Sequence, residues 1–580
     1  MTRLTPPLIA AVAFAALVGR PAAFGQSRSA GADAAKQMED AAAGRATRSP
    51  IAAGGNDPGL DMAPDTRLEV VQAAVAAAPK IPDGPVKPNW DSLKAHYRVP
   101  PWYTEAKFGL MMHWGLYSVP AYRSEWYEKH MYAALSDWHV QNFGPQETFG
   151  YKDFIPMFTA AKFDPADWAD LFAKSGARFV MPTAQHHDNF ALWASDGAAP
   201  FNSGVMGPKR DLIGDLGKAV RARGLKYGLS NHGIENFQFI NPRREIAERL
   251  KAAKADLFDP KYADFCNVAD RSDEACKRFL INWAERNVEL IDKYQPDILW
   301  YDNGIDQRFL DPLKLWLAAY YYNRAAEWGK AVTLNTKKAA YAPSGTNVQT
   351  IGSIIDFKKI GGRSPGDIRT GVWDVDEPIG STWGYTKGMR ITSAQSIIGK
   401  LIDTVSKNGT LMLNLSPQAD GTIDPQQRET LVGIGEWLKI NGEAIYGTHS
   451  WIKFAEGGRD RATPRIHFTV KGDALFAIIV GDWPERGVTI PSLKTDGEAE
   501  GDVTQVTLVG HDGPLQFRRD AAGLRVSLPP TPPCAHAYVL KVIGLRTNPT
   551  TVTADGNPLP DGHWKRYSVL FAVRHRPVVR

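Results

Sequence analysis

Short apolar runs in this chain repeatedly stop at side chains that can donate, accept or transfer a proton. The run Ile298–Tyr301 stops at Asp302, which is followed directly by Asn303 and Gly304. A carboxylate before Asn-Gly is common in turns, so spacing alone favours a capping role for Asp302. The alternative is chemical, because an ionised carboxylate can act as a nucleophile or stabilise a developing positive charge.

Four other apolar runs also end on polar groups. These ends are His113-Trp114, His186-His187-Asp188, Asn231-His232 and Lys358-Lys359. In a parallel barrel the carboxyl ends of all the strands meet on one face, where enzymes of this architecture build their sites. One such group would be a cap, whereas five that converge favour a catalytic role for Asp302.

Elements that would position these groups alternate along the chain from about residue 100. Apolar runs predict strands at 107–115, 178–188, 225–232, 297–304, 331–337 and 353–359. Amphipathic patterns predict helices at 163–177, 211–224 and about 275–294, the first capped by Asp164 and ended by Gly176. Repeated β-then-α units predict a parallel sheet, and their number predicts an α/β fold with a catalytic (β/α)8-like barrel at residues 89–442.

The pattern changes after the barrel. Short alternating strands with Gly, Pro and Asp turns predict a C-terminal antiparallel β-sandwich at residues 443–545. The expected strands are 465–472, 474–481, 503–510, 515–520, 524–529 and 536–544, and a helix at 424–442 joins the two parts.

The first residues have the features of a secretory signal. Residues 1–25 carry a basic start, a short apolar core and small residues near Gly25, so we expect a signal peptide. Residues 26–88 form a low-complexity lead-in, and residues 546–580 form a basic tail of unknown structure. No later segment is apolar enough to cross a membrane. We therefore expect a periplasmic or secreted protein that is free of the membrane after signal cleavage.

Charge and cysteine content exclude several classes of partner. The net charge is only +5 and both signs are interspersed, so no nucleic-acid partner is expected. Cys266, Cys276 and Cys534 lack metal-site spacing, and both a Cys266–Cys276 disulfide and free thiols remain open. Adjacent strand residues such as His186 and His187 face opposite ways, which disfavours metal binding by the pair. We expect neither a metal nor a cofactor, and the oligomeric state, a homo-oligomer included, stays open.

Seven segments taken in order carry a family resemblance. They are AKFGLMMHWGLYSVPAYRSEWY, QHHDNFALW, GLKYGLS, YQPDILWYDNG, STWGY, NGTLMLNLSPQADGTI and NGEAIYGTHSW. With these segments the chain resembles the family 29 glycoside hydrolases, the α-L-fucosidases, over roughly residues 90–545. The resemblance departs from the common pattern at Asn189, which stands where a glycine is frequent, and at His232, where many relatives carry a tyrosine.

The resemblance implies a retaining enzyme in which one carboxylate attacks the anomeric carbon and a second acid protonates the leaving oxygen. It places the nucleophile at Asp302. The sugar pocket that it implies is formed by His113, Trp126, His186, His187, His232, Lys359 and Trp383. Imidazoles would bond to sugar hydroxyls and tryptophan would cover the apolar face, although Trp126 and Trp383 could equally be packing residues. Lys359 and Arg363 are the candidates for an arginine that many relatives carry.

The acid/base segment is GVWDVDEPIGSTWGY, residues 371–385. Counting back from Tyr385 places Asp374 on the position where relatives carry a glutamate. Asp376 and Glu377 are alternatives. In an extended segment Asp376 shares the side of Asp374, while Glu377 faces away.

The resemblance thus implies a retaining exo-glycosidase that hydrolyses terminal α-L-fucosyl residues of a fucosylated oligosaccharide or glycoconjugate by double displacement. One alternative is the same fold acting on α-L-galactosides, which differ by a hydroxyl at C6 that an apolar pocket rejects only weakly. Another is a carbohydrate-binding protein whose catalytic site has decayed, an idea prompted by the altered acid/base segment.

Overall fold

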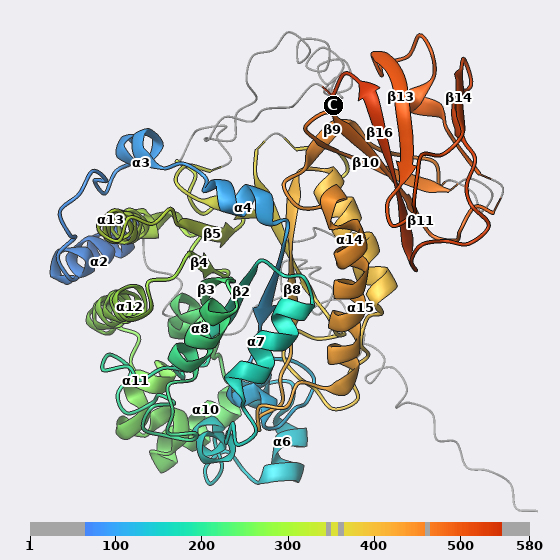
Figure 1. Cartoon of the computed structure of the whole chain (residues 1–580). Coiled ribbons are helices and arrows are strands. Elements are labelled where there is room, and N and C mark those ends of the chain that lie inside the picture. The colour runs from blue at the N-terminus through green and yellow to red at the C-terminus, as the bar shows by residue number, and fades with distance from the viewer. Residues whose placement is uncertain are drawn as a thin grey trace, which may run out of the picture. The chain divides into compact units, whose positions relative to one another are not determined.

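Eight parallel strands close into a barrel in the computed structural model (Figure 1). The structure describes residues 64–343, 350–357, 365–369, 371–458, 464–485 and 487–547. The barrel strands pair in sequence order, and β8 closes the ring on β1. They are β1 (Phe108–Met112), β2 (Phe179–Gln185), β3 (Lys226–Asn231), β4 (Ile298–Tyr301), β5 (Thr333–Lys337), β6 (Ile354–Asp356), β7 (Trp373–Pro378) and β8 (Gly409–Leu415).

The first six strands lie where the sequence predicts them, and the barrel is confirmed. Strand β7 was not predicted, because Asp374, Asp376 and Glu377 give it a polar pattern unlike that of a buried strand. The inward face of β7 carries Asp374, which is hydrogen-bonded to Tyr103 and Asn335, and Asp376, which pairs with Lys337. Strand β8 was recognised only as part of a family segment.

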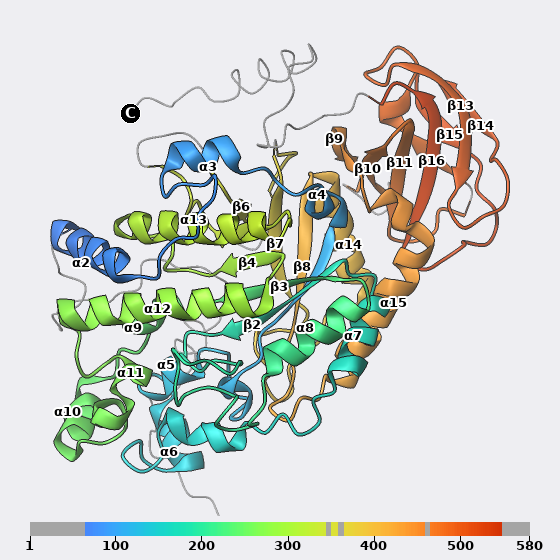
Figure 2. The same cartoon turned by 60° about the vertical axis from the view of Figure 1, so that its left-hand side comes forward.

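Helices cover the outside of the barrel. Figure 2 shows α12 and α13 in contact with each other along its outer side. The helices are α2 (Pro64–Ala77), α3 (Trp90–His96), α4 (Pro101–Ala106), α5 (Tyr127–Met131), α6 (Ser136–Phe143), α7 (Pro165–Lys174), α8 (Leu212–Ala222), α9 (Asn236–Phe239), α10 (Arg244–Ala253), α11 (Ala263–Cys266), α12 (Asp273–Tyr294), α13 (Asp311–Glu327), α14 (Ala394–Ser406) and α15 (Pro425–Asn441).

Helix α7 shows how sequence signals set the element boundaries. Asp164 accepts hydrogen bonds from the backbone N–H groups of Ala166 and Asp167, at 2.9 and 3.2 Å, and Pro165 follows in the first turn. Gly176 takes a φ of 83° just beyond the helix, a conformation that glycine adopts readily. The cap and the stop that the sequence predicts are both confirmed.

An apolar core fills the barrel at the end where its strands begin. Tyr103 of α4 stacks on Phe179 of β2 with ring centroids 5.6 Å apart. Gly109 of β1 faces this pair, and a Cβ there would lie 2.2 Å from the Phe179 ring. The strand therefore needs glycine at this position, and the packed end leaves the opposite end for polar groups.

The last part of the predicted lead-in, expected to be flexible or partly helical, contains helix α2. Val71 and Ala74 of α2 are buried, and α2 contacts α12 and α13. The Asn323 side chain of α13 accepts a hydrogen bond from Val86 N at 2.9 Å and donates to Pro82 O at 3.0 Å. These contacts attach residues 64–88 to the barrel. The predicted signal peptide, residues 26–63 and the tail after 547 lie outside the described residues.

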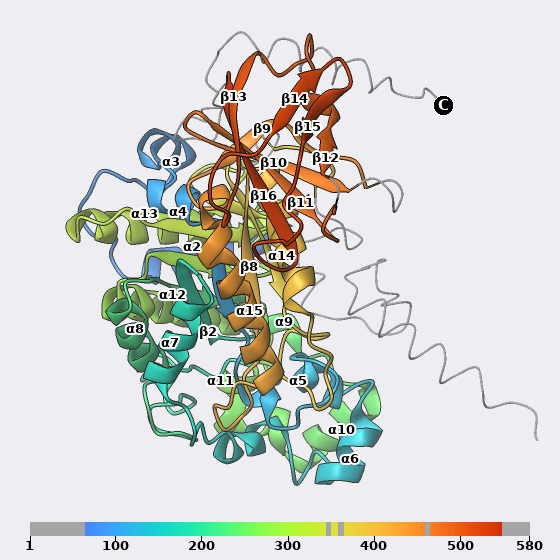
Figure 3. The same ribbon diagram turned by 45° about the vertical axis from the view of Figure 1, so that its right-hand side comes forward.

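The C-terminal part consists of two antiparallel sheets, orange to red in Figure 3, which confirms the predicted architecture. The sheets have the orders β13-β16-β11-β10-β9 and β12-β15-β14, and residues of both share one hydrophobic core. The strands are β9 (His449–Glu456), β10 (Arg465–Lys471), β11 (Ala474–Val480), β12 (Val488–Ile490), β13 (Gly501–Leu508), β14 (Phe517–Asp520), β15 (Gly523–Val526) and β16 (Ala537–Leu545).

Helices α14 and α15 connect the barrel to these sheets. The Ser406 hydroxyl at the end of α14 lies 3.0 Å from His467 Nδ1 of β10, and Trp437 Nε1 of α15 donates to Ala537 O of β16 at 2.9 Å. Both bonds are buried, so they fix the attachment of the second part.

Two further expectations concern cysteine and the membrane. Cys266, Cys276 and Cys534 all carry free thiols, so the disulfide alternative is not realised. Within the described ranges, no helix combines the length and hydropathy that crossing a bilayer requires.

Candidate active site

Four of the five predicted strand ends converge on one face of the barrel. His113 follows β1, His186 and His187 follow β2, His232 follows β3 and Asp302 follows β4. The ring centroids of His186 and His232 are 5.0 Å apart, and that of His113 lies 5.1 Å from His232. Lys358 and Lys359, the fifth end, and Arg363 lie outside the described residues.

Asp302 is the centre of this group. Its Oδ1 lies 2.9 Å from Lys337 Nζ, and its Oδ2 lies 3.2 Å from His232 Nδ1 and 3.5 Å from His187 Nε2. Burial alone would raise the pKa of Asp302, but Lys337 and the two histidines outweigh it and hold the pKa well below its ordinary value. The side chain is 8% exposed. Asp302 is therefore a buried carboxylate that stays ionised.

The tautomer of His232 follows from its partners. Burial lowers its pKa to about 3, so the ring is neutral and carries a single N–H. The ionised Asp302 can only accept, so the N–H belongs on Nδ1, which lies 3.2 Å from Asp302 Oδ2, and Nε2, 2.6 Å from the Ser230 hydroxyl, accepts. Ser230 on β3 therefore orients an N–H toward the carboxylate.

The pKa of His187 is shifted in the opposite direction. Burial would lower its pKa, but Glu235 and Asp302 outweigh burial and raise it above the ordinary value. The Nδ1 atom lies 3.1 Å from the backbone carbonyl of His232 and 3.3 Å from Glu235 Oε2. Nδ1 thus faces Glu235 and Nε2 faces Asp302, and these two carboxyl groups favour the protonated form of the ring.

His113 and His186 provide neutral imidazoles, because burial lowers the pKa of each. Asn414 of β8 donates its Nδ2 to Trp383 O at 2.8 Å, so its Oδ1 accepts from His113 Nδ1 at 2.7 Å. The Nε2 atom of His113 is then an acceptor. Within the described residues His186 Nδ1 has no hydrogen-bond partner. His113 Nε2 can therefore accept a hydrogen bond from a ligand hydroxyl, whereas His186 Nδ1 is buried.

Aromatic rings enclose the charged group. Lys337 Nζ lies 5.1 Å from the Trp300 ring centroid and 5.2 Å from that of Trp383, within cation–π range. Trp126, from the loop after β1, meets the His187 ring edge-on at 6.0 Å. The structure thus places Trp126 and Trp383, as well as the histidines, around Asp302.

Local backbone geometry supports the loops that carry these groups. Asn189 adopts a φ of 64°, and its side chain donates to the carbonyls of Asp264 and Phe265 at 2.9 and 3.0 Å. Asparagine tolerates this left-handed conformation, so it can replace the glycine that is common in relatives. Gly304 has a φ of 87°, and a Cβ there would lie 2.6 Å from the Glu235 side chain.

The three acid/base candidates on β7 have different surroundings. Asp374, the first choice from the sequence, is fully buried beneath the site, where it accepts hydrogen bonds from Tyr103, at 2.5 Å, and from Asn335. Tyr103 belongs to α4, which precedes β1. Asp374 therefore faces the packed end of the barrel, and the structure does not bring it to Asp302.

Asp376 and Glu377 point to opposite faces of β7. Asp376 Oδ2 lies 2.9 Å from Lys337 Nζ, so one ammonium joins Asp376 to Asp302. Glu377 faces outward and pairs with Lys400 of α14 at 2.9 Å. Of the three candidates, only Asp376 joins the group around Asp302.

Sequence reasoning missed two charged members of the site. Lys337 is the last residue of β5, so it fits the pattern of polar strand ends, but it lay within a predicted strand that was assigned no role. Glu235 ends the short 3-10 helix η3 (Gly233–Glu235) after β3. Its proximity to His187 depends on the fold, and no local signal marks it.

Two groups of side chains have the spacing of metal ligands. In the first, ring nitrogens of His113, His186 and His232 lie within 4.8 Å of one another. Three neutral imidazoles suit zinc. A second set consists of His187, His232 and Asp302. There the Lys337 ammonium, 2.9 Å from Asp302, would oppose a cation. The sequence expectation of a metal-free site stays a prediction.

Comparisons with known proteins agree on one family. A family model described as Alpha-L-fucosidase matches residues 73–443, and one described as Alpha-L-fucosidase C-terminal domain matches residues 459–543. The tissue α-L-fucosidase of Homo sapiens is 31% identical over 492 residues, covering 79% of this chain and 92% of that protein. The plasma α-L-fucosidase of Homo sapiens is 32% identical over 461 residues, covering 76% and 88%.

A solved structure shows the same similarity in three dimensions. The α-fucosidase of Thermotoga maritima in complex with a mechanism-based inhibitor is 32% identical, with a TM-score of 0.62, and the match covers 79% of this chain and 100% of that chain. The same protein in complex with fucose matches equally well, with a TM-score of 0.62.

Proposed function

We propose that this chain, which belongs to the α-L-fucosidase family, is a retaining exo-α-L-fucosidase that releases terminal α-L-fucosyl residues from fucosylated glycans. The observation that carries the proposal is Asp302, a buried carboxylate kept ionised at the carboxyl end of a barrel strand by Lys337 and two histidines. A retaining glycosidase needs such a group to attack the anomeric carbon and form the glycosyl-enzyme ester.

The surrounding groups suit a deoxy sugar. The acceptor Nε2 of His113 can bond to a sugar hydroxyl. The rings of Trp126 and Trp383 offer apolar faces to C–H and methyl groups.

For the proton donor we propose Asp376 in place of Asp374. Asp302 and Asp376 each lie 2.9 Å from the same Nζ atom, so these two carboxylate oxygens are at most twice that distance apart. Retaining glycosidases hold their two carboxyl groups about 5–5.5 Å apart. As the general acid, Asp376 must carry a proton when the glycosidic bond breaks and give it to the leaving oxygen. It is then a carboxylate that pairs with Lys337 while Asp302 is an ester, and it takes the proton back from the attacking water.

Glu235 is the other carboxyl group near Asp302 that could act as the proton donor. Burial and the charge of Asp302 raise its pKa although His187 opposes them, which suits a proton donor. However, Glu235 and Asp302 contact opposite nitrogens of the His187 ring, so an imidazole separates them. That separation suits the retaining mechanism less well than the pair formed with Asp376.

The nucleophile is tested with Asp302→Gly and nitrophenyl α-L-fucoside. We expect turnover to be lost, and added azide to restore part of it with formation of the inverted fucosyl azide. Asp306→Asn is the matched control, since Asp306 lies in the same loop but pairs with the exposed Lys338. Near wild-type turnover by the Asp302 variant without azide would remove this residue from the mechanism.

The proton donor is tested by comparing two leaving groups. A general acid contributes roughly 10²–10⁴-fold, and the loss is largest for a basic leaving group. Asp376→Ala should therefore cripple hydrolysis of a fucosyl disaccharide while formation of the intermediate from nitrophenyl fucoside suffers much less. Asp374→Ala, Glu377→Ala and Glu235→Gln serve as comparisons, and the role belongs to whichever variant shows the split.

Substrate identity and catalytic competence are read from the same assay. Faster release of nitrophenol from the α-L-galactoside than from the fucoside would favour the galactosidase alternative. Binding of fucose without turnover of any activated fucoside would favour a decayed binding protein. We also propose export through the leader at residues 1–25, which the mass of the mature protein tests, and size-exclusion chromatography with light scattering tests for a homo-oligomer.

A further inference from the structure

A hollow lies at the end of the barrel opposite Asp302, where β2 and β3 begin. Its volume is about 530 Å³, within the ~300–1,000 Å³ range of pockets that hold small ligands. Its walls come from the end of α7, from the segments before β2 and β3, and from the second half of α15. Helix α7 contacts both α8 and α15, and Figure 2 shows these three helices side by side.

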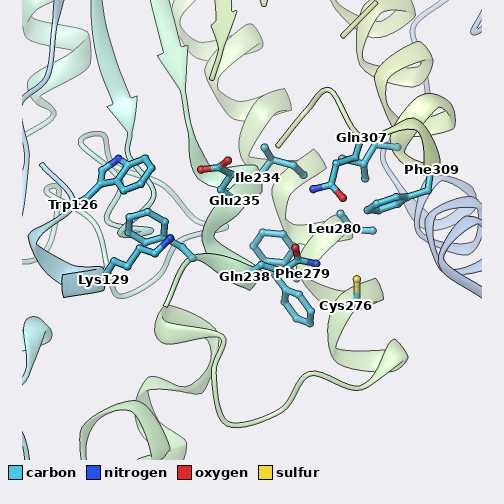
Figure 4. Close-up of a pocket in the computed structure, with 13 residues that line it drawn as sticks. Trp126, Lys129, Ile234, Glu235, Gln238, Cys276, Phe279, Leu280, Gln307 and Phe309 are labelled. Carbon is cyan, nitrogen blue, oxygen red and sulfur yellow. The ribbon is translucent and has the colours of Figure 1, made fainter. Parts of the chain in front are cut away.

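This hollow is separate from the aromatic cavity shown in Figure 4. That cavity has a volume of about 180 Å³, and Trp126, Glu235 and Phe309 are among the residues that line it. The buried His187 ring lies between Glu235 and Asp302. None of the described residues that line the hollow belongs to that cavity or to the group around Asp302.

Positive charge dominates the lining of the hollow. Among the described residues that line it, one is acidic, Glu436, and four are basic: Lys174, Arg178, Arg223 and Lys439. We call this hollow the basic groove. Arg223 is paired, because its Nε lies 2.5 Å from Asp170 Oδ1. Within the described part of the chain the other three basic side chains form no ion pair, so the groove carries positive charge that an anion can neutralise.

Arg178 is held at the wall of the groove by contacts beneath its guanidinium group. The guanidinium carbon lies 3.9 Å from the Tyr446 ring centroid. The Tyr446 hydroxyl donates to Gly176 O at 2.6 Å, and Arg178 N donates to Phe108 O at 2.9 Å. These contacts fix the ring and the backbone that support the side chain. Its N–H groups have no acceptor among the described residues, so the planar fork can bind an oxyanion by two parallel hydrogen bonds.

Two ammonium groups and apolar side chains complete the groove. Lys174 ends α7, and Lys439 is in the last turn of α15, so they belong to different walls. The two helices approach closely at Gly435, where a Cβ would collide with Lys174 O. Leu438 and the exposed Val432 add apolar surface to the α15 wall. The groove thus combines anion-binding groups on two walls with surface for C–H groups.

This composition narrows the class of ligand. Tyr446 is the one aromatic side chain among the described lining residues, and Arg178 stacks on its ring, which disfavours a nucleic acid that would need rings for base stacking. A single small anion would occupy only a fraction of the volume. A saccharide with anionic substituents presents oxyanions to the guanidinium and ammonium groups and its C–H faces to Leu438 and Val432.

We propose that the basic groove binds an anionic polysaccharide, one whose sugars carry sulfate or carboxylate groups. Arg178 binds one anionic group through its planar fork, and Lys174 and Lys439 neutralise neighbouring groups along the same chain. Because the groove and Asp302 lie at opposite ends of the barrel, a polymer bound there leaves the catalytic mouth open. The proposal goes beyond the fucosidase activity and does not depend on it.

The test uses dextran sulfate, carboxymethyl dextran and unmodified dextran, fractionated to short oligosaccharides. None contains fucose, so the catalytic group takes no part in binding. Isothermal titration calorimetry on the full-length protein should show binding of the anionic dextrans that weakens as salt is raised, and no binding of unmodified dextran. The tighter of the two anionic dextrans identifies the preferred substituent.

Substitutions locate the binding site. Arg178→Gln, and the double variant Lys174→Gln with Lys439→Gln, should each raise the Kd for the preferred dextran by about three- to tenfold. Arg243→Gln and Lys251→Gln are the matched controls, because both residues are exposed at α10 and neither lines the groove; they should change the Kd by less than about twofold. Turnover of nitrophenyl fucoside should be unchanged in all four variants.

Several outcomes would overturn the groove as a binding site. These are a wild type that binds neither anionic dextran, equal binding of unmodified dextran, and Kd values that change equally in groove variants and controls or in none. Tighter groove-dependent binding of a DNA oligonucleotide, or of inorganic sulfate alone, would replace the polysaccharide. If Arg178→Gln does not fold, the double lysine variant, which leaves the stack on Tyr446 in place, decides the question. A wild type without fucosidase activity would refute the proposed function and leave this result unaffected.

Discussion

Removal of the Lys337 charge should raise the pKa of Asp302 and so change the pH dependence of catalysis. The Lys337 side chain is 6% exposed, and its ammonium lies 2.9 Å from Asp302 and 2.9 Å from Asp376. Burial would lower the pKa of Lys337, but Asp302, Asp376 and Asp356 outweigh it and raise the pKa, so the ammonium is retained. The Lys337→Met substitution keeps the length of the side chain and removes the charge. Two carboxylates would then face each other in a buried site.

The magnitude follows from the cost of breaking a buried pair. Removing one partner of such a pair typically costs about 3–5 kcal/mol. One pKa unit corresponds to about 1.4 kcal/mol, so the cost equals about 2–4 pKa units, shared between two carboxylates. We therefore expect the acid limb of kcat/KM for nitrophenyl fucoside to move upward by about 1–2 pH units, because Asp302 must be ionised to attack.

The stability difference has a defined pH window. The folded pKa of Asp302 lies below its ordinary value, so pairing with Lys337 stabilises the fold above about pH 4 and is lost as the pH falls through the folded pKa. The free energies of unfolding of wild type and Lys337→Met should therefore differ most at neutral pH and converge in acid. Chemical denaturation at pH 7 and at lower pH measures this.

Two controls make the result interpretable. Lys337→Arg keeps the charge and should hold the acid limb near its wild-type position. Lys338→Met removes the next lysine, whose pair with Asp306 is largely exposed, and should change neither the limb nor the stability by more than ~0.5 kcal/mol. An acid limb that stays in place in Lys337→Met, or an equal shift in Lys338→Met, would show that the ammonium does not control Asp302.

Three further variants test other parts of the structure. His113→Ala should keep cooperative unfolding while kcat/KM falls at least about tenfold, because the ring lies at a strand end, where it donates to Asn414. A variant that does not fold would make His113 a core residue. Ser230→Ala removes the hydrogen-bond partner of His232 Nε2. It should lower kcat/KM for α-L-fucosyl fluoride by roughly tenfold with little change in KM. Unchanged kinetics would mean that Ser230 does not set the tautomer of His232. Burial raises the pKa of Asp256 to about 7 in the folded state, so the folded protein binds this proton more tightly than the unfolded chain does. The free energy of unfolding should therefore fall as the pH rises from about 4 to 7. Asp256→Asn should flatten this fall, as thermal unfolding at pH 4, 5.5 and 7 would show, and an unchanged slope would contradict it.

Local sequence signals were sufficient for the elements that depend on nearby residues. The apolar runs of β1 to β6, the Asp164 cap and the Gly176 stop follow from residues within a few positions of each other. The same signals placed His113, His186, His187, His232 and Asp302 at strand ends. Because parallel strands of a closed barrel expose their carboxyl ends on one face, their convergence could be inferred without coordinates.

The tertiary structure alone decided which carboxylates share an environment. Asp374 and Asp376 lie on the same face of β7, and the strand pattern cannot separate them. They differ because Tyr103 and Asn335, distant in sequence, enclose Asp374, whereas Lys337 pairs Asp376 with Asp302. The charge of a buried carboxyl is set by neighbours within a few ångströms, and those neighbours come from strands far apart in the chain. The sequence by itself therefore determined the barrel and the residues at its mouth, and only the packing of the barrel interior decided their protonation and partners.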